Sequence, residues 1–289
     1  MEPLIRVRGL TKRFGNGCSR CPESTGPDSE TNRCSDCGTV IACNDVNFNL
    51  YRDEALGIVG ESGSGKSTLV RLLHFEWEAT AGRFEISREA GLGEIPGLFN
   101  GGGSSRNLLE LNTFSKRLIR NALMGIVYQN PNLGLRMQVS SGGNVAERLL
   151  GGGWRNIAAM RKRTADLLER TEIPVERMDE PPSNFSGGMQ QRVQIAKALS
   201  NNPLILFLDE VTTGLDLSVQ ARVLDLIRTL RREYRLSMLV VSHDLGVINL
   251  LCQRTMVMKN GRVVEAGLTD QILQDPQHRY TQLLVASQL

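Results

Sequence analysis

A glycine-rich segment, GESGSGKS at residues 60–67, constrains this chain more than any other feature. It matches the pattern G-x-x-x-x-G-K-[ST], in which backbone N–H groups surround a polyphosphate. The apolar run LGIV at 56–59 precedes it and the helical pattern TLVRLL at 68–73 follows it, which is the context that the pattern requires. The sequence therefore predicts a P-loop in which Lys66 contacts the β- and γ-phosphates of a nucleotide and Ser67 binds Mg²⁺.

A second segment, LILFLDE at residues 204–210, supplies the acidic groups that such a site needs. Its run of aliphatic residues predicts a fully buried strand that ends in two adjacent carboxylates. One carboxylate can hold Mg²⁺ through water, and the other can orient or deprotonate an attacking water. We assign these roles to Asp209 and Glu210, because paired acids on a solvated surface are a weak alternative beside a P-loop.

Composition excludes several classes of protein. The 289 residues suit one large domain or two small ones, and the net charge of +3 gives no electrostatic case for a nucleic-acid partner. No apolar run approaches the ~18 residues of a membrane span, and the N-terminus lacks the apolar core of a signal peptide. We therefore expect a cytoplasmic protein without membrane insertion, whose cysteines are reduced or bound to metal.

Strand and helix patterns alternate along the chain, which predicts an α/β sheet with a substantial parallel part. Strand patterns lie at 4–7, 40–50, 56–59, 124–128, 204–210 and 238–241, and helical patterns at 144–172 and 186–199. The Asn260-Gly261 pair predicts a hairpin between two strand patterns at 255–258 and 262–265. Residues 82–115 suggest another hairpin, with a loose tip at 101–105.

Four cysteines interrupt the first pair of strands. Cys18-x2-Cys21 is followed after twelve residues by Cys34-x2-Cys37, a spacing typical of a four-thiolate zinc site. The intervening residues are too polar to fold on a core of their own, so a metal is the simplest way to order them. Zinc is the first choice, and an iron–sulfur cluster or free thiols are the alternatives. The remaining two, Cys43 and Cys252, are expected to be buried as small hydrophobic residues.

With five more motifs in order, the chain resembles the ATP-binding-cassette (ABC) ATPases along nearly its whole length. In chain order, these motifs are TKRFG at 11–15, which contains Phe14, then Gln129, FSGGMQQR at 185–192, TGLD at 213–216 and His243. The resemblance implies a P-loop nucleotide-binding domain with a helical subdomain and an antiparallel β subdomain. We expect one ABC domain over 1–289, with a cysteine insert at 15–38, a helical subdomain at 130–200 and a C-terminal tail at 266–289.

The resemblance also implies a set of site residues for Mg-ATP hydrolysis. The expected catalytic residues are Glu210, His243 and Gln129. Mg²⁺ is expected on Ser67, Gln129 and Asp209. The expected nucleotide contacts are Phe14, which stacks on adenine, and Gly60, Ser62, Gly63, Gly65, Lys66, Ser67, Thr68, Ser186, Gly187 and Gly188.

In this family the amides of the signature segment cap the γ-phosphate of the opposite subunit's ATP. One chain cannot complete its own site, so catalysis implies a nucleotide-sandwich dimer, either a homodimer or a heterodimer with another ABC ATPase. Three residues depart from the usual motifs: Phe185 and Met189 in the signature, and Val211 after Glu210. None of them removes a group that contacts phosphate, so we expect hydrolysis to be retained. We expect these residues instead to specialise the neighbouring surface that couples the ATPase to its partner.

Within the family, two segments resemble the ATP-binding K subunits of carbon–phosphorus lyase systems, which break down phosphonates. They are NLGLRMQVSSGGNVAERL at 132–149 and GLTDQILQDPQHRYTQLL at 267–284. The ending is shared with the ATPases of dipeptide and oligopeptide importers, which are the alternative, although those usually continue further. A chromosome or repair ATPase is disfavoured, because no coiled-coil insert separates the two halves. The lyase resemblance implies lyase core subunits as partners, which we expect to meet residues 131–143. The expected contact face carries Asn132, Leu133, Leu135, Arg136 and Met137, and the alternative is that these residues only pack the helical subdomain.

Overall fold

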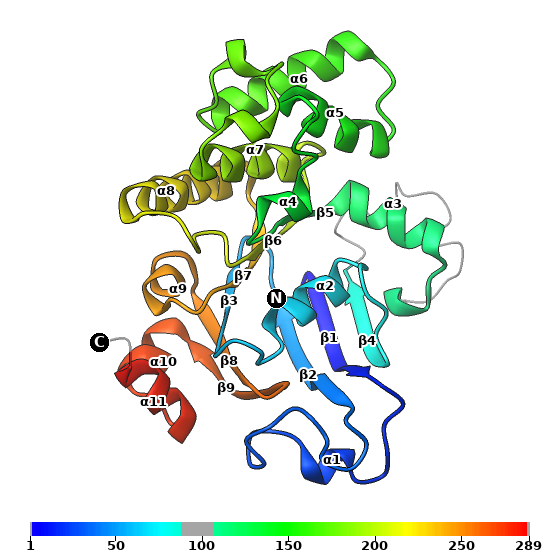
Figure 1. Ribbon diagram of the computed structural model, residues 1–289, viewed down its shortest axis with the longest axis vertical. Helices are drawn as coiled ribbons and strands as arrows, with labels where there is room; N and C mark the ends of the chain where they lie inside the picture. Colours follow the sequence, from blue (N-terminus) through cyan, green and yellow to red (C-terminus); the bar gives the residue numbers. More distant parts are fainter. Residues whose placement is uncertain (1, 88–106, 288–289) are drawn as a thin grey trace. The chain divides into compact units, whose positions relative to one another are not determined.

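The computed structural model describes residues 2–87 and 107–287, which form two compact units. The first unit comprises residues 1–116 and 239–289, and the second comprises residues 117–238. Figure 1 shows the elements of both units with their labels. None of the helices in the described ranges is long and apolar enough to cross a bilayer.

Two groups of strands build the first unit. Strand β1 (Ile5–Phe14) lies between β2 (Val40–Leu50) and β4 (Ala81–Ile86) in an antiparallel sheet. Strand β3 (Ala55–Val59) pairs in parallel with β8 (Arg254–Lys259), which forms an antiparallel hairpin with β9 (Arg262–Leu268). All five residues of β3 are buried, as the aliphatic run requires. The predicted Asn260-Gly261 turn is confirmed, and both residues have positive φ.

Short helices complete this unit around those strands (Figure 1). Helix α2 (Lys66–Leu73) follows the P-loop and buries Leu69, Val70, Leu72 and Leu73. The others are α1 (Cys21–Ser24) in the cysteine insert, and α9 (Leu245–Leu251), α10 (Thr269–Gln274) and α11 (Arg279–Ala286) in the C-terminal part.

The second unit is mainly helical. Strand β5 (Met124–Val127) pairs in parallel with β6 (Ile205–Asp209). Helices α4 (Pro131–Gly134), α5 (Ser141–Gly151), α6 (Ile157–Arg170) and α7 (Gly187–Leu199) lie between these strands in the sequence, and α8 (Leu217–Tyr234) follows them. Helices α5, α6 and α7 pack on one another, as Figure 1 shows. The elements α3 (Thr113–Leu123) and β7 (Ser237–Val241) span the boundaries of the two units.

The hairpin predicted over 82–115 is wrong for the described residues, and its expected tip at 101–105 lies outside them. Strand β4 takes β1 as its partner, with Ile86 opposite Ile5. Residues 108–110 form a 3₁₀ turn and α3 begins at Thr113. Asn107 caps this turn and joins it to β4, because its Oδ1 accepts hydrogen bonds from the backbone N–H groups of Leu109 and Phe84.

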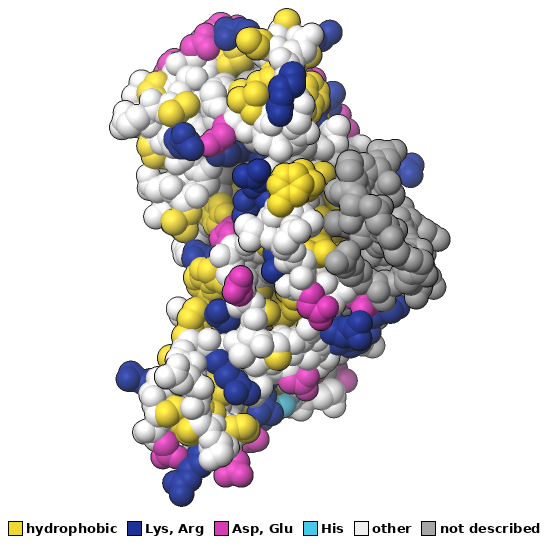
Figure 2. All heavy atoms as spheres, turned by 90° about the vertical axis from the view of Figure 1, so that its right-hand side faces the viewer, with side chains coloured by type: hydrophobic (Ala, Val, Ile, Leu, Met, Phe, Trp, Pro, Cys, Tyr) yellow, Lys and Arg dark blue, Asp and Glu magenta, His cyan; other side chains and the backbone are white. Residues whose placement is uncertain are grey.

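Charged side chains of both signs are interspersed over the face shown in Figure 2. Some charged side chains of helix α6 form ion pairs, such as Arg170 with Asp166 within the helix and Arg161 with Asp179 in a nearby turn. Solvated pairs of this kind contribute little to stability, about 0–1 kcal/mol each. They account for Arg161 and Arg170 of α6 without requiring a binding surface.

Asn144, fully buried in α5, organises the segment that precedes this helix. Its Oδ1 accepts a hydrogen bond from the backbone N–H of Arg136 at 2.8 Å. Its Nδ2 lies 3.0–3.1 Å from the carbonyl oxygens of Arg136, Val139 and Ser140. One buried amide thus makes four short contacts with the backbone of residues 136–140 and holds the turn in place.

We predict that Asn144→Ala lowers the free energy of unfolding by about 2–4 kcal/mol, because it removes the hydrogen bonds that a fully buried amide makes to residues 136–140. Urea unfolding followed by circular dichroism measures the change. Asn249→Ala, at an exposed position of α9, is the control and should stay within about 0.5 kcal/mol of wild type. Equal urea midpoints for the two variants would contradict the assigned role of Asn144.

Candidate active site

The P-loop lies between β3 and α2 in the first unit, and its glycines are required by close backbone contacts. A Cβ on Gly60 would lie 2.1 Å from the carbonyl oxygen of Met258, and one on Gly65 would lie 2.0 Å from that of Ala42. Both glycines have positive φ, +147° and +106°. Only glycine fits at these two positions, so strands β8 and β2 determine the path of the loop.

Lys66 is held over this loop. Its Nζ donates hydrogen bonds to the carbonyl oxygens of Gly60 at 2.6 Å and Glu61 at 2.8 Å, and to Ser64 Oγ at 3.4 Å. The side chain is buried. The backbone N–H groups of the first turn of α2 have no acceptor within the helix, so this end of the helix suits an anion.

Phe14 lies at the end of β1 and is 43% exposed. Trp77 supports it in an edge-to-face contact, with ring centroids 5.3 Å apart and an interplanar angle of 88°. The guanidinium of Arg71 lies 4.9 Å from the centroid of the Trp77 ring. The supported, partly exposed ring can stack on a nucleotide base. Sequence reasoning missed Trp77, which no motif indicates.

His243 is exposed after β7 and lines a cavity of about 700 Å³ together with Gly60 and Glu61. Tyr280 of α11 lines the same cavity, and its hydroxyl accepts a hydrogen bond from the backbone N–H of Glu61 at 2.9 Å. Burial raises the pKa of Tyr280, which keeps the hydroxyl neutral. The first unit thus brings the histidine and the P-loop together. The contact of Tyr280 with the loop was not predicted from the sequence.

In the second unit, the structure brings Gln129 and Glu210 together from positions 81 residues apart. Gln129 Nε2 donates to Glu210 Oε2 at 3.2 Å, and Thr213 Oγ1 donates to the same oxygen at 3.3 Å. Asp209 is buried at the end of β6. Glu210 has a φ of +50°, which is uncommon for a residue with a side chain and turns the chain sharply after the strand. The two carboxylates therefore differ in burial and in direction.

The signature segment begins α7. Ser186 caps the helix, with its Oγ accepting from the backbone N–H of Met189 at 3.4 Å, and Ser186 and Gly187 are exposed. A Cβ on Gly188 would lie 2.3 Å from Val219 Cγ1, so α8 requires glycine there. The exposed amides at this helix N-terminus are suited to an anion.

The two unusual signature residues, Phe185 and Met189, share one neighbour. The guanidinium of Arg177 lies 4.4 Å from the centroid of the Phe185 ring, and its Nη1 lies 3.6 Å from Met189 Sδ. Glu180 pairs with the same guanidinium at 2.7 Å. The two departures within the signature segment therefore form one local cluster around Arg177.

One residue of the contact face predicted at 131–143 does not lie on the surface. Leu135 is 5% exposed, so its expected place on the surface is wrong; the turn held by Asn144 directs it inward. Leu133 and Val139 are exposed instead, at 58% and 40%. Arg136 pairs with Glu147 at 2.8 Å, as a solvated ion pair. Leu133 is therefore the more exposed of the two apolar residues in this segment that a partner can reach.

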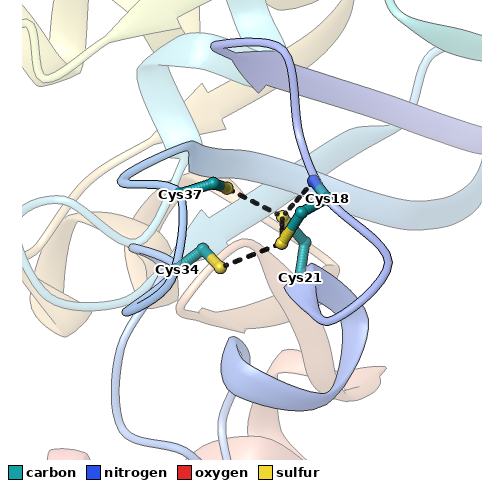
Figure 3. Close-up of side chains that lie close together, drawn as sticks. All are labelled: Cys18, Cys21, Cys34 and Cys37. Carbon is teal, nitrogen blue, oxygen red and sulfur yellow. Dashed lines mark hydrogen bonds between the residues drawn. The ribbon is translucent and has the colours of Figure 1, made fainter.

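The four cysteines of the insert point toward one another (Figure 3). The Sγ atom of Cys18 lies 3.7 Å from those of Cys21 and Cys34, and the Sγ atoms of Cys21 and Cys37 are 3.5 Å apart. Four sulfurs at about 2.3 Å from one tetrahedral zinc ion are roughly 3.8 Å apart. The cluster fits a single metal ion, whereas disulfide sulfurs would lie at about 2.05 Å.

Hydroxyl groups beside the second cysteine pair favour thiolates there. Ser24 Oγ donates to Cys34 Sγ at 3.2 Å, and this is the largest of several hydrogen bonds that together lower the pKa of Cys34 to about 6. Thr39 lies beside Cys37 and lowers the pKa of that thiol as well. Cys43 and Cys252 are both buried, as predicted, and burial raises the pKa of Cys43 to about 12. The four cysteines of the insert could thus hold a metal ion, and the other two cysteines pack as apolar side chains.

Comparisons with known proteins agree with this geometry. The family described as ABC transporter matches residues 43–213. The putative phosphonates utilization ATP-binding protein PhnK of Escherichia coli K12 is 47% identical over 85% of this chain and 90% of its own length. The oligopeptide transport ATP-binding protein OppD of Bacillus subtilis is 38% identical over 86% of this chain and 67% of its own length.

A solved structure shows the same architecture. The ATP-binding cassette MJ0796, in a dimeric post-hydrolysis state bound to ADP and Pi, superimposes with a TM-score of 0.71 and 26% identity. The match covers 92% of this chain and 98% of that one. With its P-loop, paired carboxylates and signature helix, the chain belongs to the ATP-binding cassette family and is an ATPase of that family, whose cassettes bind Mg-ATP and work as dimers with partner subunits.

Proposed function

We propose that this chain hydrolyses Mg-ATP in a phosphonate-utilisation system in the cytoplasm, as an ATP-binding subunit of a carbon–phosphorus lyase assembly. The observation that carries the proposal is the 47% identity to PhnK, over 90% of the length of that protein. The second candidate is a subunit of a peptide importer, favoured by the 38–40% identity to oligopeptide and peptide import ATPases. The first candidate has the higher identity and accounts for more of its relative's length.

In this proposal, Phe14 stacks on adenine, while residues 60–68 and Lys66 bind the phosphates. Ser67, Gln129 and Asp209 bind Mg²⁺, Glu210 polarises the attacking water, and His243 contacts the γ-phosphate. The contact of Glu210 with Gln129 supports these roles, since both side chains would face the same water. Residues 186–188 act on the nucleotide of a second subunit, which is either another copy or a different ABC ATPase. Leu217, 84% exposed beside Asp216 in the TGLD motif, supports such a contact between subunits.

We further propose that the cysteine insert at 15–38 binds one zinc ion, that 130–200 is a helical subdomain whose segment 131–143 meets the partner, and that 266–289 is a C-terminal tail of one domain. The sulfur spacing supports zinc, because it matches one tetrahedral ion. The exposed Leu133 supports a partner surface in the helical subdomain.

Glu210→Gln should retain Mg-ATP binding but slow hydrolysis by roughly 10²-fold or more, because the amide cannot polarise water as the carboxylate does. The variant should accumulate as an ATP-bound dimer, which size-exclusion chromatography with light scattering detects. Glu233→Gln, at the far end of α8, is the charge-matched control and should hydrolyse ATP normally. A near-normal turnover of the Glu210 variant, with partner subunits present, would exclude the assigned role.

Purified protein should contain one zinc per chain by elemental analysis, and a Cys34→Ser, Cys37→Ser variant should lose it, since two of four thiolates are removed. Cys252→Ala, outside the insert, should keep the metal. Wild-type protein with iron instead would reassign the site to an iron–sulfur cluster. Protein with neither metal would mean that the four thiols are free.

The phosphonate assignment is tested by growth of the source organism after deletion of this gene. Growth on a phosphonate as sole phosphorus source should stop, whereas growth on inorganic phosphate should continue. Leu133→Asp should fail to restore growth and should lose co-purification of lyase subunits, because it places a charge on the exposed apolar contact. Ile157→Asp, on the 80% exposed first residue of α6, should restore growth. Co-purification with membrane permeases and normal phosphonate growth of the deletion strain would favour the importer.

A further inference from the structure

The cysteine insert contacts the P-loop directly. Asn32, between the two cysteine pairs, donates a hydrogen bond from Nδ2 to the carbonyl oxygen of Gly63 at 3.1 Å. Gly63 is at the exposed tip of the loop, with a φ of +82°, and no described atom beyond its chain neighbours lies within 4 Å of where a Cβ would be. The amide of Asn32 is therefore a brace on the part of the loop that packing leaves open.

This brace determines the orientation of one peptide group. In a trans peptide the C=O of Gly63 and the N–H of Ser64 point in opposite directions. The carbonyl accepts from Asn32, and the N–H of Ser64 donates to the carbonyl oxygen of Glu61 at 3.1 Å. Both ends of the peptide plane are thus occupied. The backbone N–H groups that follow, toward Lys66 and Ser67, therefore start from a peptide group whose orientation is fixed.

The fold of the insert holds Asn32 in this position. The carbonyl oxygen of Asn32 accepts from the N–H of Ile41 at 2.7 Å, and its neighbour Arg33 forms a bridge with Val40. Two residues further on, Cys34 enters the thiol cluster, and its N–H donates to the carbonyl oxygen of Thr39 at 2.9 Å. The position of Asn32 thus depends on β2 on one side and on the four cysteines on the other.

A second route joins the insert to the P-loop through the β8–β9 turn. Asn260 Nδ2 donates to the carbonyl oxygen of Gly26 at 3.4 Å, and Lys259 lies 3.7 Å from Glu30. The N–H of Gly261 then donates to the carbonyl oxygen of Ser64 at 2.9 Å. The insert and the loop therefore share two sets of contacts, both within the first unit.

We propose that Asn32 is a positioning residue for the P-loop, and that metal loading of the cysteine insert strengthens Mg-ATP binding through this contact. The second part rests on the proposed metal site. A preformed loop binds more tightly than one that must be ordered on binding, because the ordering cost has already been met. The coupling is reciprocal, so bound Mg-ATP also raises the affinity of the insert for its metal, measured by equilibrium competition with a chelator.

The test compares the affinity of four protein forms for Mg-AMPPNP: wild type and Asn32→Ala, each with the metal present and after removal by a chelator. In the metal-loaded form, Asn32→Ala should raise the Kd by about two- to tenfold, the range for one neutral hydrogen bond. Metal content and the rate at saturating ATP should change little. Removal of the metal should weaken binding by wild type, but should weaken the Asn32→Ala protein much less.

Two further variants separate the brace from a general effect on the insert. Asn32→Asp should bind nucleotide more weakly than Asn32→Ala, because a carboxylate cannot donate to Gly63 and repels the polyphosphate. Ser29→Ala, which removes a hydrogen bond from Ser29 Oγ to the carbonyl oxygen of Glu23 within the insert, should bind nucleotide like wild type.

The outcomes distinguish this inference from the metal proposal. Protein that contains no metal refutes the metal site and the coupling, while the Asn32 variants still test the brace. Metal-loaded Asn32→Ala with wild-type affinity overturns the positioning role. Equal loss of affinity in both proteins after metal removal overturns the route through Asn32.

Discussion

The close contact of the P-loop glycines with neighbouring strands is the constraint on which the nucleotide site depends. Gly60 lies against the carbonyl oxygen of Met258 in β8, and Gly65 lies against that of Ala42 in β2. Backbone from two strands far apart in sequence thereby fixes the loop between β3 and α2. A side chain at either position would displace a strand, so the loop and its strands must form together.

The positions of the two adjacent carboxylates, Asp209 and Glu210, depend on strand burial and on an unusual backbone angle. Asp209 is buried at the end of strand β6. Glu210 follows it with a positive φ, and its own side chain contacts Gln129 and Thr213. A backbone angle that is unfavourable for glutamate persists because surrounding contacts determine it, as is common at functional sites. The geometry gives adjacent acids separate surroundings, which is what separate roles in metal binding and water activation require.

The cysteine insert adds a structural element to this site. It is short and polar, and its order derives from four convergent sulfurs and from hydrogen bonds to β2 and to the β8–β9 turn. Its contact with Gly63 places it beside the chemistry. The signature helix shows a comparable local specialisation, in which Phe185 and Met189 pack around Arg177.

The sequence by itself determined the P-loop, the buried strands at 56–59 and 204–210, the hairpin at Asn260-Gly261 and the four-cysteine spacing. These features depend on local rules: glycine conformations, aliphatic runs and ligand spacing. Only the tertiary structure decided that β4 pairs with β1 and that Leu135 turns inward near Asn144. It also decided that Trp77 packs against Phe14, that Tyr280 contacts Glu61 of the P-loop, and that Asn32 reaches Gly63. Each of these depends on a contact between distant segments, and a side chain's local sequence carries no information about which distant backbone group it will meet.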